Sequence, residues 1–120
     1  MTCPFCDHTP AYIENELTLA RLDKYPVSKG HTLVTTKRHV PGLFDCTEHE
    51  INELWTTVRE VERHLVAKYM PDGFNVGVNV GEDAGQTVMH THIHVIPRYS
   101  GDMTDPRGGV RGVIPGKQKY

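Results

Sequence analysis

Three histidines at every second position, His90, His92 and His94, are the residues of this 120-residue chain best suited to chemistry. Side chains of an extended strand alternate between its two faces, so the three imidazoles are expected on one face, roughly 6.6 Å apart. An imidazole acts as nucleophile, acid, base or metal ligand near neutral pH. The spacing therefore predicts a surface that acts on one substrate, or that divides between a metal and a substrate.

A second candidate is the pair Cys3 and Cys6, spaced as C-x-x-C. A closed tetrahedral zinc site needs four ligands, so the pair supplies half a site and histidines can supply the rest. The N-terminus lacks the features of a secretory signal, which makes the cytoplasm the expected compartment. In a reducing compartment, metal binding or redox chemistry is more common for such a pair than a structural disulfide. The third cysteine, Cys46, is expected to be a small buried residue.

The segment GQTVMHTHIHVIPR, which contains the three histidines, resembles the signature of the histidine triad (HIT) superfamily of nucleotidyl hydrolases and transferases. The similarity extends to GHTLVTTKRH upstream and to Asn79, and covers about residues 3–100. The run GDMTDPRGGVRGVIP is most similar to the branch of diadenosine polyphosphate hydrolases that includes the fragile histidine triad protein. The transferase branch resembles H-x-H-x-Q, so a third histidine, His94, favours hydrolysis over transfer.

The resemblance implies a role for each matching residue. His92, the middle histidine, would attack the α-phosphorus of a nucleotide and form a covalent nucleotidyl intermediate that water hydrolyses. His94 and His31 would surround the phosphate and donate hydrogen bonds as charge moves onto its oxygens. The remaining substrate contacts implied are a ribose contact from Asp23 and phosphate contacts from Asn79, Thr87 and Gln86.

Two of these assignments have structural alternatives. A carboxylate at Asp23 suits a vicinal diol, but a solvated turn residue would look the same. The run GEDAGQT, residues 81–87, reads either as a simple hairpin connection or as a backbone nest whose N–H groups cradle a phosphate. We expect this loop to do both.

The resemblance also completes the metal site. Some HIT proteins, and the related hexose-1-phosphate uridylyltransferases, carry an N-terminal C-x-x-C whose zinc is completed by a histidine after the upstream strand and by the first histidine of the triad. A structural zinc next to His92 would hold that ring in place. In the alternative, the cysteines lie on a frayed end and His90 serves the phosphate. The implied ligands are Cys3, Cys6, His39 and His90, with His8 as a substitute.

Two residues depart from the family pattern. Thr91 stands where the family usually has a hydrophobic residue, and its hydroxyl makes it no neutral replacement. It is expected to face away from the triad, so the chemistry should survive. Thr36 stands where the family often has a proline, which bears on where that strand ends.

Several strands are expected to position these residues. Alternation within residues 11–23 predicts one or two strands with a turn, and β-branched residues predict a strand over 31–39. Alternation predicts another strand over 74–80 and a long final strand over 86–98, stopped at Pro97.

One long helix is expected between these strands. Thr47 and Glu50 form an S/T-x-x-E capping box, and apolar residues at helical spacing continue to about Tyr69. Strands around one helix, joined by short turns, predict an α+β domain with a mostly antiparallel sheet.

Composition excludes several classes of protein. Hydrophobic residues make up 38% of the chain and charged residues 23%, a balance typical of soluble globular proteins. Apolar runs are only a few residues long, which argues against a membrane span. A net charge of −2 provides no global positive field for nucleic acid or an anionic membrane.

We divide the chain into a HIT-like nucleotide-binding catalytic domain, 1–105, and a basic tail, 106–120, with too many glycines and prolines for a regular element. The tail is either solvated or brings Arg107 and Arg111 to the distal phosphates of a polyphosphate, including across a dimer.

The expected function is hydrolysis of dinucleoside polyphosphates of the diadenosine tri- or tetraphosphate type. The alternatives are a purine nucleoside phosphoramidase and a noncatalytic, zinc-dependent nucleotide-binding module. A catalytic metal on the histidine face is less favoured because no carboxylate lies at ligand spacing in that strand. Magnesium is an expected companion of a polyphosphate substrate, although no dedicated protein site is visible. The resemblance also implies a homodimer, with the helix around Trp55 at the interface.

Overall fold

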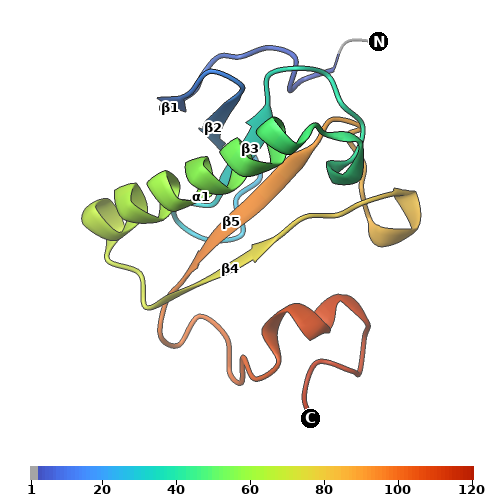
Figure 1. Ribbon diagram of the computed structural model, residues 1–120. Helices are drawn as coiled ribbons and strands as arrows, with labels where there is room; N and C mark the ends of the chain where they lie inside the picture. Colours follow the sequence, from blue (N-terminus) through green and yellow to red (C-terminus); the bar gives the residue numbers. More distant parts are fainter. Residues whose placement is uncertain (1–2) are drawn as a thin grey trace.

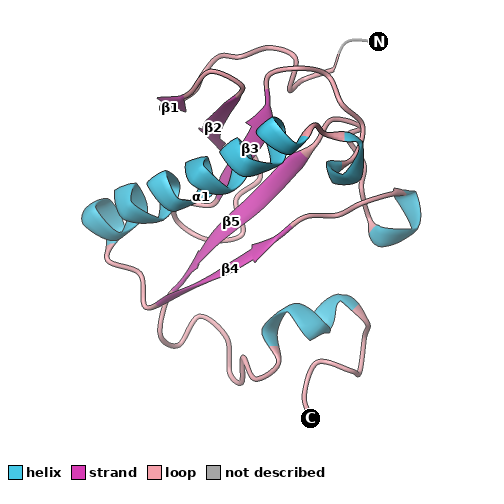
Figure 2. Ribbon diagram, in the orientation of Figure 1, coloured by secondary structure: helices cyan, strands magenta, loops and turns pink. Residues whose placement is uncertain are grey.

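A five-stranded sheet and one long helix form the computed structural model, which describes residues 3–120 (Figures 1 and 2). The sheet order is β1-β2-β3-β5-β4, and all neighbouring strands are antiparallel. This arrangement confirms the predicted α+β class. The strands are β1 (Ile13–Glu14), β2 (Thr18–Leu22), β3 (Thr32–Thr36), β4 (Gly73–Gly77) and β5 (His92–Arg98).

The helix α1 (Glu48–Tyr69) begins at the predicted capping box. The Thr47 hydroxyl accepts the Glu50 N–H at 3.1 Å, and the Glu50 carboxylate accepts the Thr47 N–H at 2.8 Å. Arg38 donates two further hydrogen bonds to this buried carboxylate, at 2.8 and 3.0 Å, and they hold the pKa of Glu50 below its ordinary value. The start of the helix is thereby joined to the segment that follows β3.

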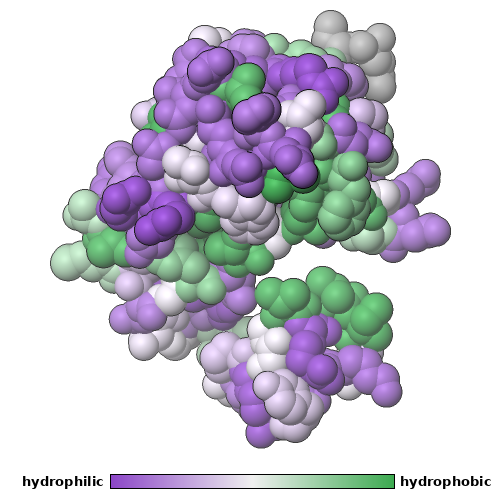
Figure 3. Space-filling model, viewed as in Figure 1, coloured by the Kyte–Doolittle hydropathy of each residue, from purple (hydrophilic) through white to green (hydrophobic). Residues whose placement is uncertain are grey.

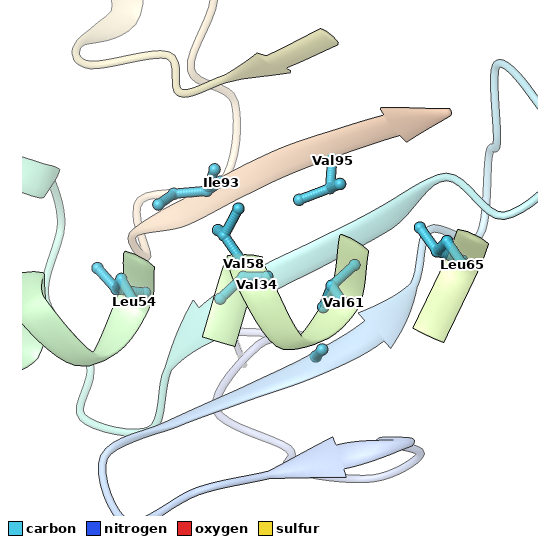
Figure 4. Packing of buried hydrophobic residues seen from close by; sticks show 8 residues of the cluster. Val34, Leu54, Val58, Val61, Leu65, Ile93 and Val95 are labelled. Carbon is cyan, nitrogen blue, oxygen red and sulfur yellow. The ribbon is translucent and has the colours of Figure 1, made fainter. Parts of the chain in front are cut away.

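The hydrophobic core lies between α1 and one face of the sheet (Figures 1 and 4). Ala20, Val34 and Ile93 are register partners across β2, β3 and β5, so their side chains share this face. Each valine, leucine or isoleucine side chain buried there contributes about 1.5–3 kcal/mol. The helix supplies the other half of the core with Leu54, Val58, Val61 and Leu65.

The opposite face of the sheet carries the side chains that alternate with these core residues. Leu33 pairs with Arg21 on one side and with His94 on the other, and Thr35 pairs with His92. Because directly paired residues point to the same face, Arg21 and His94 lie in one row across the sheet. The chemistry expected from the sequence therefore lies on the face that α1 does not cover.

The predicted final strand, 86–98, is wrong at its beginning, whereas its end at residue 98 is confirmed. It begins at His92, because β3 ends at Thr36 and β4 ends at Gly77, which leaves the preceding residues without a strand to pair with. Pro97 does not stop the strand, which continues to Arg98. Pro97 lies past the last β3 pair, and its carbonyl accepts the Ser28 hydroxyl at 2.7 Å, so its missing N–H faces a side with no strand.

Two other predicted elements are also corrected. The strand predicted over 74–80 ends at Gly77. The tail, predicted to lack regular structure, contains a short 3-10 helix, η3 (Gly109–Val113), one of three with η1 (Leu43–Asp45) and η2 (Glu82–Ala84). Gly108 has a φ of +88°, and a Cβ there would meet the Gln118 carbonyl oxygen at 1.6 Å. Only glycine fits that approach of the tail to itself.

The tail forms a separate lobe beside the edge strand β4 (Figures 1 and 3). Figure 3 shows hydrophobic surface on this lobe, where Val110, Val113 and Ile114 are exposed. Within residues 3–120, the structure contains no helix with the length and apolar character needed to cross a membrane.

The capping box gives a stability prediction. Thr47→Ala removes the hydroxyl that accepts the Glu50 N–H, and should lower the free energy of unfolding by about 1 kcal/mol. Thr56→Ala is the matched control, because Thr56 is an exposed residue inside the helix and alanine has the higher helix propensity. Urea denaturation followed by circular dichroism measures both changes. Equal losses in the two variants would contradict a capping role.

Candidate active site and metal site

A cavity of about 1100 Å³ lies at the histidine face of the sheet. Two of its lining histidines, His92 and His94, come from β5. Five of the predicted substrate and nucleophile residues thus meet at one cavity. They are Asp23 after β2, Asn79 and Thr87 between β4 and β5, and His92 and His94 themselves.

The ring of His92 is held by its own backbone. Its Nδ1 lies 2.8 Å from the carbonyl oxygen of His90, and a carbonyl can only accept, so Nδ1 carries the proton. In the neutral ring Nε2 then has a free lone pair. The side chain is 7% exposed and lines the cavity, so this lone pair belongs to a ring that is both constrained and accessible.

His31 and His94 form a hydrogen-bonded pair of neutral rings. The Val27 N–H donates to His31 Nδ1 at 3.1 Å, so the His31 proton is on Nε2. That Nε2 lies 2.9 Å from His94 Nδ1, which therefore accepts and leaves the His94 proton on its own Nε2. Burial lowers the pKa of both rings, and for His94 the neighbouring His92 and His31 add to this effect.

His31 lies behind His94 and is not among the residues that line the cavity. Asp23 lies 3.4 Å from His31 Nε2 through one oxygen and accepts the Tyr25 N–H at 2.9 Å through the other. This carboxylate partly offsets the effect of burial on the pKa of His31. Asp23 is therefore a cavity residue and a neighbour of the histidine pair, as well as a turn residue.

The hydrogen bonds of the loop before β5 fit a structural connection better than a backbone nest for phosphate. The amides of Gly81, Ala84, Gly85 and Gln86 donate to acceptors inside the loop, so these four cannot cradle a phosphate without breaking those bonds. The Gln86 side chain is buried and bonds to Gly81, Pro41 and Val88 backbone atoms. It closes the loop, whereas Thr87 and Asn79 reach the cavity.

His90 is not among the residues that line the cavity, and its ring faces the N-terminal cysteines. Its Nε2 lies 2.6 Å from the Thr36 carbonyl oxygen, so Nε2 carries the proton and Nδ1 is unprotonated. Nδ1 faces two sulfur atoms, Cys3 Sγ at 3.4 Å and Cys6 Sγ at 3.6 Å. Burial lowers the pKa of His90, which keeps the ring in the neutral form that metal binding requires.

Cys3, Cys6, His39 and His90 bring four ligand atoms within 4.8 Å of one another. His39 Nδ1 lies 3.2 Å from Cys6 Sγ. In a tetrahedral zinc site a sulfur and a nitrogen ligand lie about 3.5 Å apart. The donor set and its spacing therefore fit a structural zinc, and the alternative of a frayed end with His90 at the phosphate does not match this geometry.

Three neighbouring residues, His8, Cys46 and Thr91, also have predicted roles. His8, considered as a substitute ligand, lies 3.1 Å from the Lys37 carbonyl oxygen instead. Cys46 is half-buried, and Thr91 donates its hydroxyl to the Val40 carbonyl at 2.9 Å. That bond confirms that Thr91 does not join the triad and shows what its hydroxyl does.

Two residues that were not predicted from the sequence, Arg21 and Phe5, also line the cavity. The Phe5 ring lies edge-on to His92, with centroids 5.0 Å apart, and the Arg21 guanidinium lies 5.5 Å from the Phe5 centroid. One signal was available: Arg21 stands at a position where the alternation of β2 places apolar residues such as Leu19.

Comparisons with known proteins match this chain to one family. A family model described as the HIT domain matches residues 8–101. The asymmetrical bis(5'-nucleosyl)-tetraphosphatase of Schizosaccharomyces pombe is 37% identical over 78% of this chain and 52% of its own. The bis(5'-adenosyl)-triphosphatase of Dictyostelium discoideum is 37% identical over 76% of this chain and 61% of its own. The chain thus spans about half to three fifths of these two relatives.

Among solved structures, a Zn-bound histidine triad family protein from Mycobacterium smegmatis superposes with a TM-score of 0.78. It is 35% identical, and the match covers 88% of this chain and 81% of that one.

The hydrogen bonds around the cavity predict the proton positions. At pH 7, nitrogen-15 NMR of the imidazoles should show His31 and His94 with the proton on Nε2 and His92 with the proton on Nδ1. The folded pKa values of His31 and His94 lie below the ordinary value of about 6.5. The unfolded chain therefore takes up protons first, and the free energy of unfolding should decrease as the pH falls below about 6.5.

His31→Asn removes one ring of the pair and should flatten this pH dependence. A proton on His94 Nδ1 at pH 7, or an unfolding free energy that increases as the pH falls below 6.5, would contradict the assignment.

Proposed function

The chain belongs to the HIT domain family, and on that premise we propose that it is a nucleotidyl hydrolase that cleaves dinucleoside polyphosphates at the α-phosphorus through a covalent intermediate on His92. The observation that carries the proposal is the pair of rings at the cavity. His92 offers an unprotonated Nε2, and His94 next to it offers an Nε2–H donor. A nucleophile and a donor to the developing charge are the two groups that phosphoryl transfer needs.

In the first step, His92 Nε2 forms a bond to the α-phosphorus and the anhydride P–O bond breaks. The polyphosphate leaves with the electron pair of that bond. The His94 Nε2–H donates to an oxygen on which charge develops, and His31 keeps His94 in that tautomer. The attacked imidazole becomes a cation, and the His90 carbonyl that accepts from Nδ1 stabilises its charge.

In the second step, water forms a bond to the same phosphorus and the N–P bond breaks. The electron pair of the N–P bond returns to Nε2 and one proton of the water passes to solvent, so the products are a nucleoside monophosphate and the neutral His92 ring. Imidazole is a good leaving group here because Nδ1 keeps its proton and its carbonyl acceptor. Asp23, Asn79 and Thr87 line the cavity and would bind the ribose and phosphates.

We propose that Cys3, Cys6, His39 and His90 hold a structural zinc. The metal would supply rigidity rather than reaction chemistry, since its four protein ligands close the coordination sphere. His90 belongs to the metal cluster through Nδ1 and to His92 through its backbone carbonyl. Ordering the cluster therefore orders the acceptor that sets the His92 tautomer.

A purine nucleoside phosphoramidate is the second candidate substrate, because the same attack by His92 would expel an amine. The position of the tail supports this second candidate, because its arginines lie away from the cavity. Arg107 and Arg111 do not line the cavity, and Arg111 lies over the ring of Tyr120 at 4.6 Å. The basic residues that line the cavity are Arg21 and Lys24. If the substrate is a polyphosphate, magnesium would accompany its phosphates.

We also propose a homodimer with α1 at the interface. Trp55 is 42% exposed on the helix, although tryptophan usually buries most of its surface. A dimer seen by sedimentation that is weakened by substituting Trp55 would support this assignment.

The first measurement is turnover of diadenosine tetraphosphate and of adenosine phosphoramidate, with products resolved by mass. His92→Gly should lower the rate by about four to six orders of magnitude, because it removes the nucleophile. His49→Gly is the matched control, since His49 is exposed in the first turn of α1 and should retain activity.

The ratio of the two rates decides between the polyphosphatase and the phosphoramidase. Turnover that survives in His92→Gly would overturn the covalent mechanism. Nucleotide binding without any product would instead support a noncatalytic module.

Metal content gives an independent prediction. The purified protein should contain one zinc ion per chain, and Cys6→Ser should lose it, whereas Cys46→Ser should keep it because Cys46 lies outside the cluster. Loss of zinc should lower the thermal unfolding temperature and reduce turnover by about 10- to 100-fold. Elemental analysis and thermal unfolding with a chelator provide the test. A metal-free protein of unchanged stability would refute the structural role.

A further inference from the structure

Arg21 is a buried arginine that no step of the proposed reaction uses. It is 8% exposed and lies on the histidine face of the sheet, in the same row as Leu33 and His94. Burial of the guanidinium lowers the pKa of Arg21. A charge removed from water is costly unless it is paired or hydrogen-bonded, so its contacts indicate what the position is for.

Those contacts all go to the N-terminal loop, residues 3–7. The guanidinium donates to the Asp7 carbonyl at 2.6 Å, and at 3.4 and 3.5 Å to the carbonyls of Pro4 and Phe5. It also lies 5.5 Å from the centroid of the Phe5 ring. Its Nε is buried without a hydrogen-bond partner in the described part of the chain. One donor of the side chain is thus unsatisfied, while the others bind three carbonyls of one loop, those of Pro4, Phe5 and Asp7.

The loop held in this way serves two sites at once. Cys3 and Cys6 present their sulfur atoms to His90, and Phe5 between them lies edge-on to His90 and His92, with centroids 6.0 and 5.0 Å apart. Movement of the loop would therefore displace two ligands of the metal cluster and the ring that packs against the nucleophile.

We propose that Arg21 is a positioning residue, which holds residues 4–7 so that one loop presents Cys3 and Cys6 to the metal and Phe5 to the ring of His92. The link to catalysis rests on the proposed function of His92. The link to the metal cluster does not need it.

The planar shape of the guanidinium matters here as well as its charge. It donates in several directions within one plane and packs on an aromatic ring, whereas a lysine ammonium is a point charge on a flexible stem. Arg21→Lys keeps the charge but cannot reach the carbonyls and pack on Phe5 together. Arg21→Gln keeps part of the hydrogen bonding and loses the charge.

The test uses the full chain with Arg21→Lys and Arg21→Gln, and with Arg59→Lys and Arg59→Gln as matched controls on the exposed side of α1. Three quantities are measured in each protein. They are the affinity for Zn²⁺ against a competing chelator, the nuclear Overhauser contact between the Phe5 and His92 rings, and kcat and KM for release of the nucleoside monophosphate.

Both Arg21 variants should bind Zn²⁺ about 10- to 100-fold more weakly, the range typical for losing a group that supports metal ligands. The Phe5 to His92 contact should weaken, while the amide signals of α1 and β4 stay as in the wild type. The fall in kcat/KM should appear mainly in kcat, because the nucleophile loses its neighbour. The Arg59 variants should match the wild type in every readout.

Unchanged Zn²⁺ affinity together with an unchanged ring contact would overturn the proposal. Global unfolding of both Arg21 variants would overturn it too, since Arg21 would then be a general stabiliser of the fold. If the wild type turns over no nucleotide, the proposed hydrolase activity is wrong. The Zn²⁺ affinity and the ring contact still test the positioning role of Arg21. If turnover depends on His92 while the Arg21 variants bind Zn²⁺ normally and keep the ring contact, only the inference about Arg21 fails.

Discussion

β3 and β5 pair in a register that sets Thr35 opposite His92 and Leu33 opposite His94. Because side chains alternate along a strand, the same register turns Val34 and Ile93 to the other face, where α1 packs. A shift of one residue would bury the histidines under the helix and expose the core. The cavity, the core and the place of the helix therefore depend on one set of strand hydrogen bonds.

Backbone groups then decide the tautomers of three rings. His92 and His90 each donate a ring N–H to a backbone carbonyl, and His31 accepts from a backbone N–H. Each bond selects one of two tautomers, so chemically identical rings take different roles. His92 has an accessible lone pair, His90 can bind a metal, and His31 donates to His94. These acceptors are themselves held by the sheet and by the loops that leave it.

The beginning of β5 at His92 separates the two sites and also couples them. Since the ladder begins at His92, His90 is free to turn toward the cysteines, while its carbonyl remains next to the His92 ring. The N-terminal loop also links the two sites, because its cysteines contact His90 and its Phe5 contacts His92. The candidate metal site and the cavity thus share two short segments of chain.

Local sequence was enough to predict the helix and most of the strands, and to single out the three histidines as candidates. The capping box at Thr47 and Glu50 defines its helix through side chains three residues apart, and alternation correctly placed His92 and His94 on one face. Similarity to a family supplied the grouping of distant residues such as Cys3 and His39, which no local pattern contains.

Tertiary structure alone decided what depends on partner strands and on loops far apart in sequence. Alternation predicts that the final strand begins at residue 86, but a strand continues only where another strand pairs with it. β5 begins at His92, so strand pairing does not hold His90 on the face of His92 and His94. Likewise, the sequence shows Arg21 as one charged residue in a strand. Its role appears only when the loop that it binds, 14 residues earlier at Asp7, folds back over the sheet.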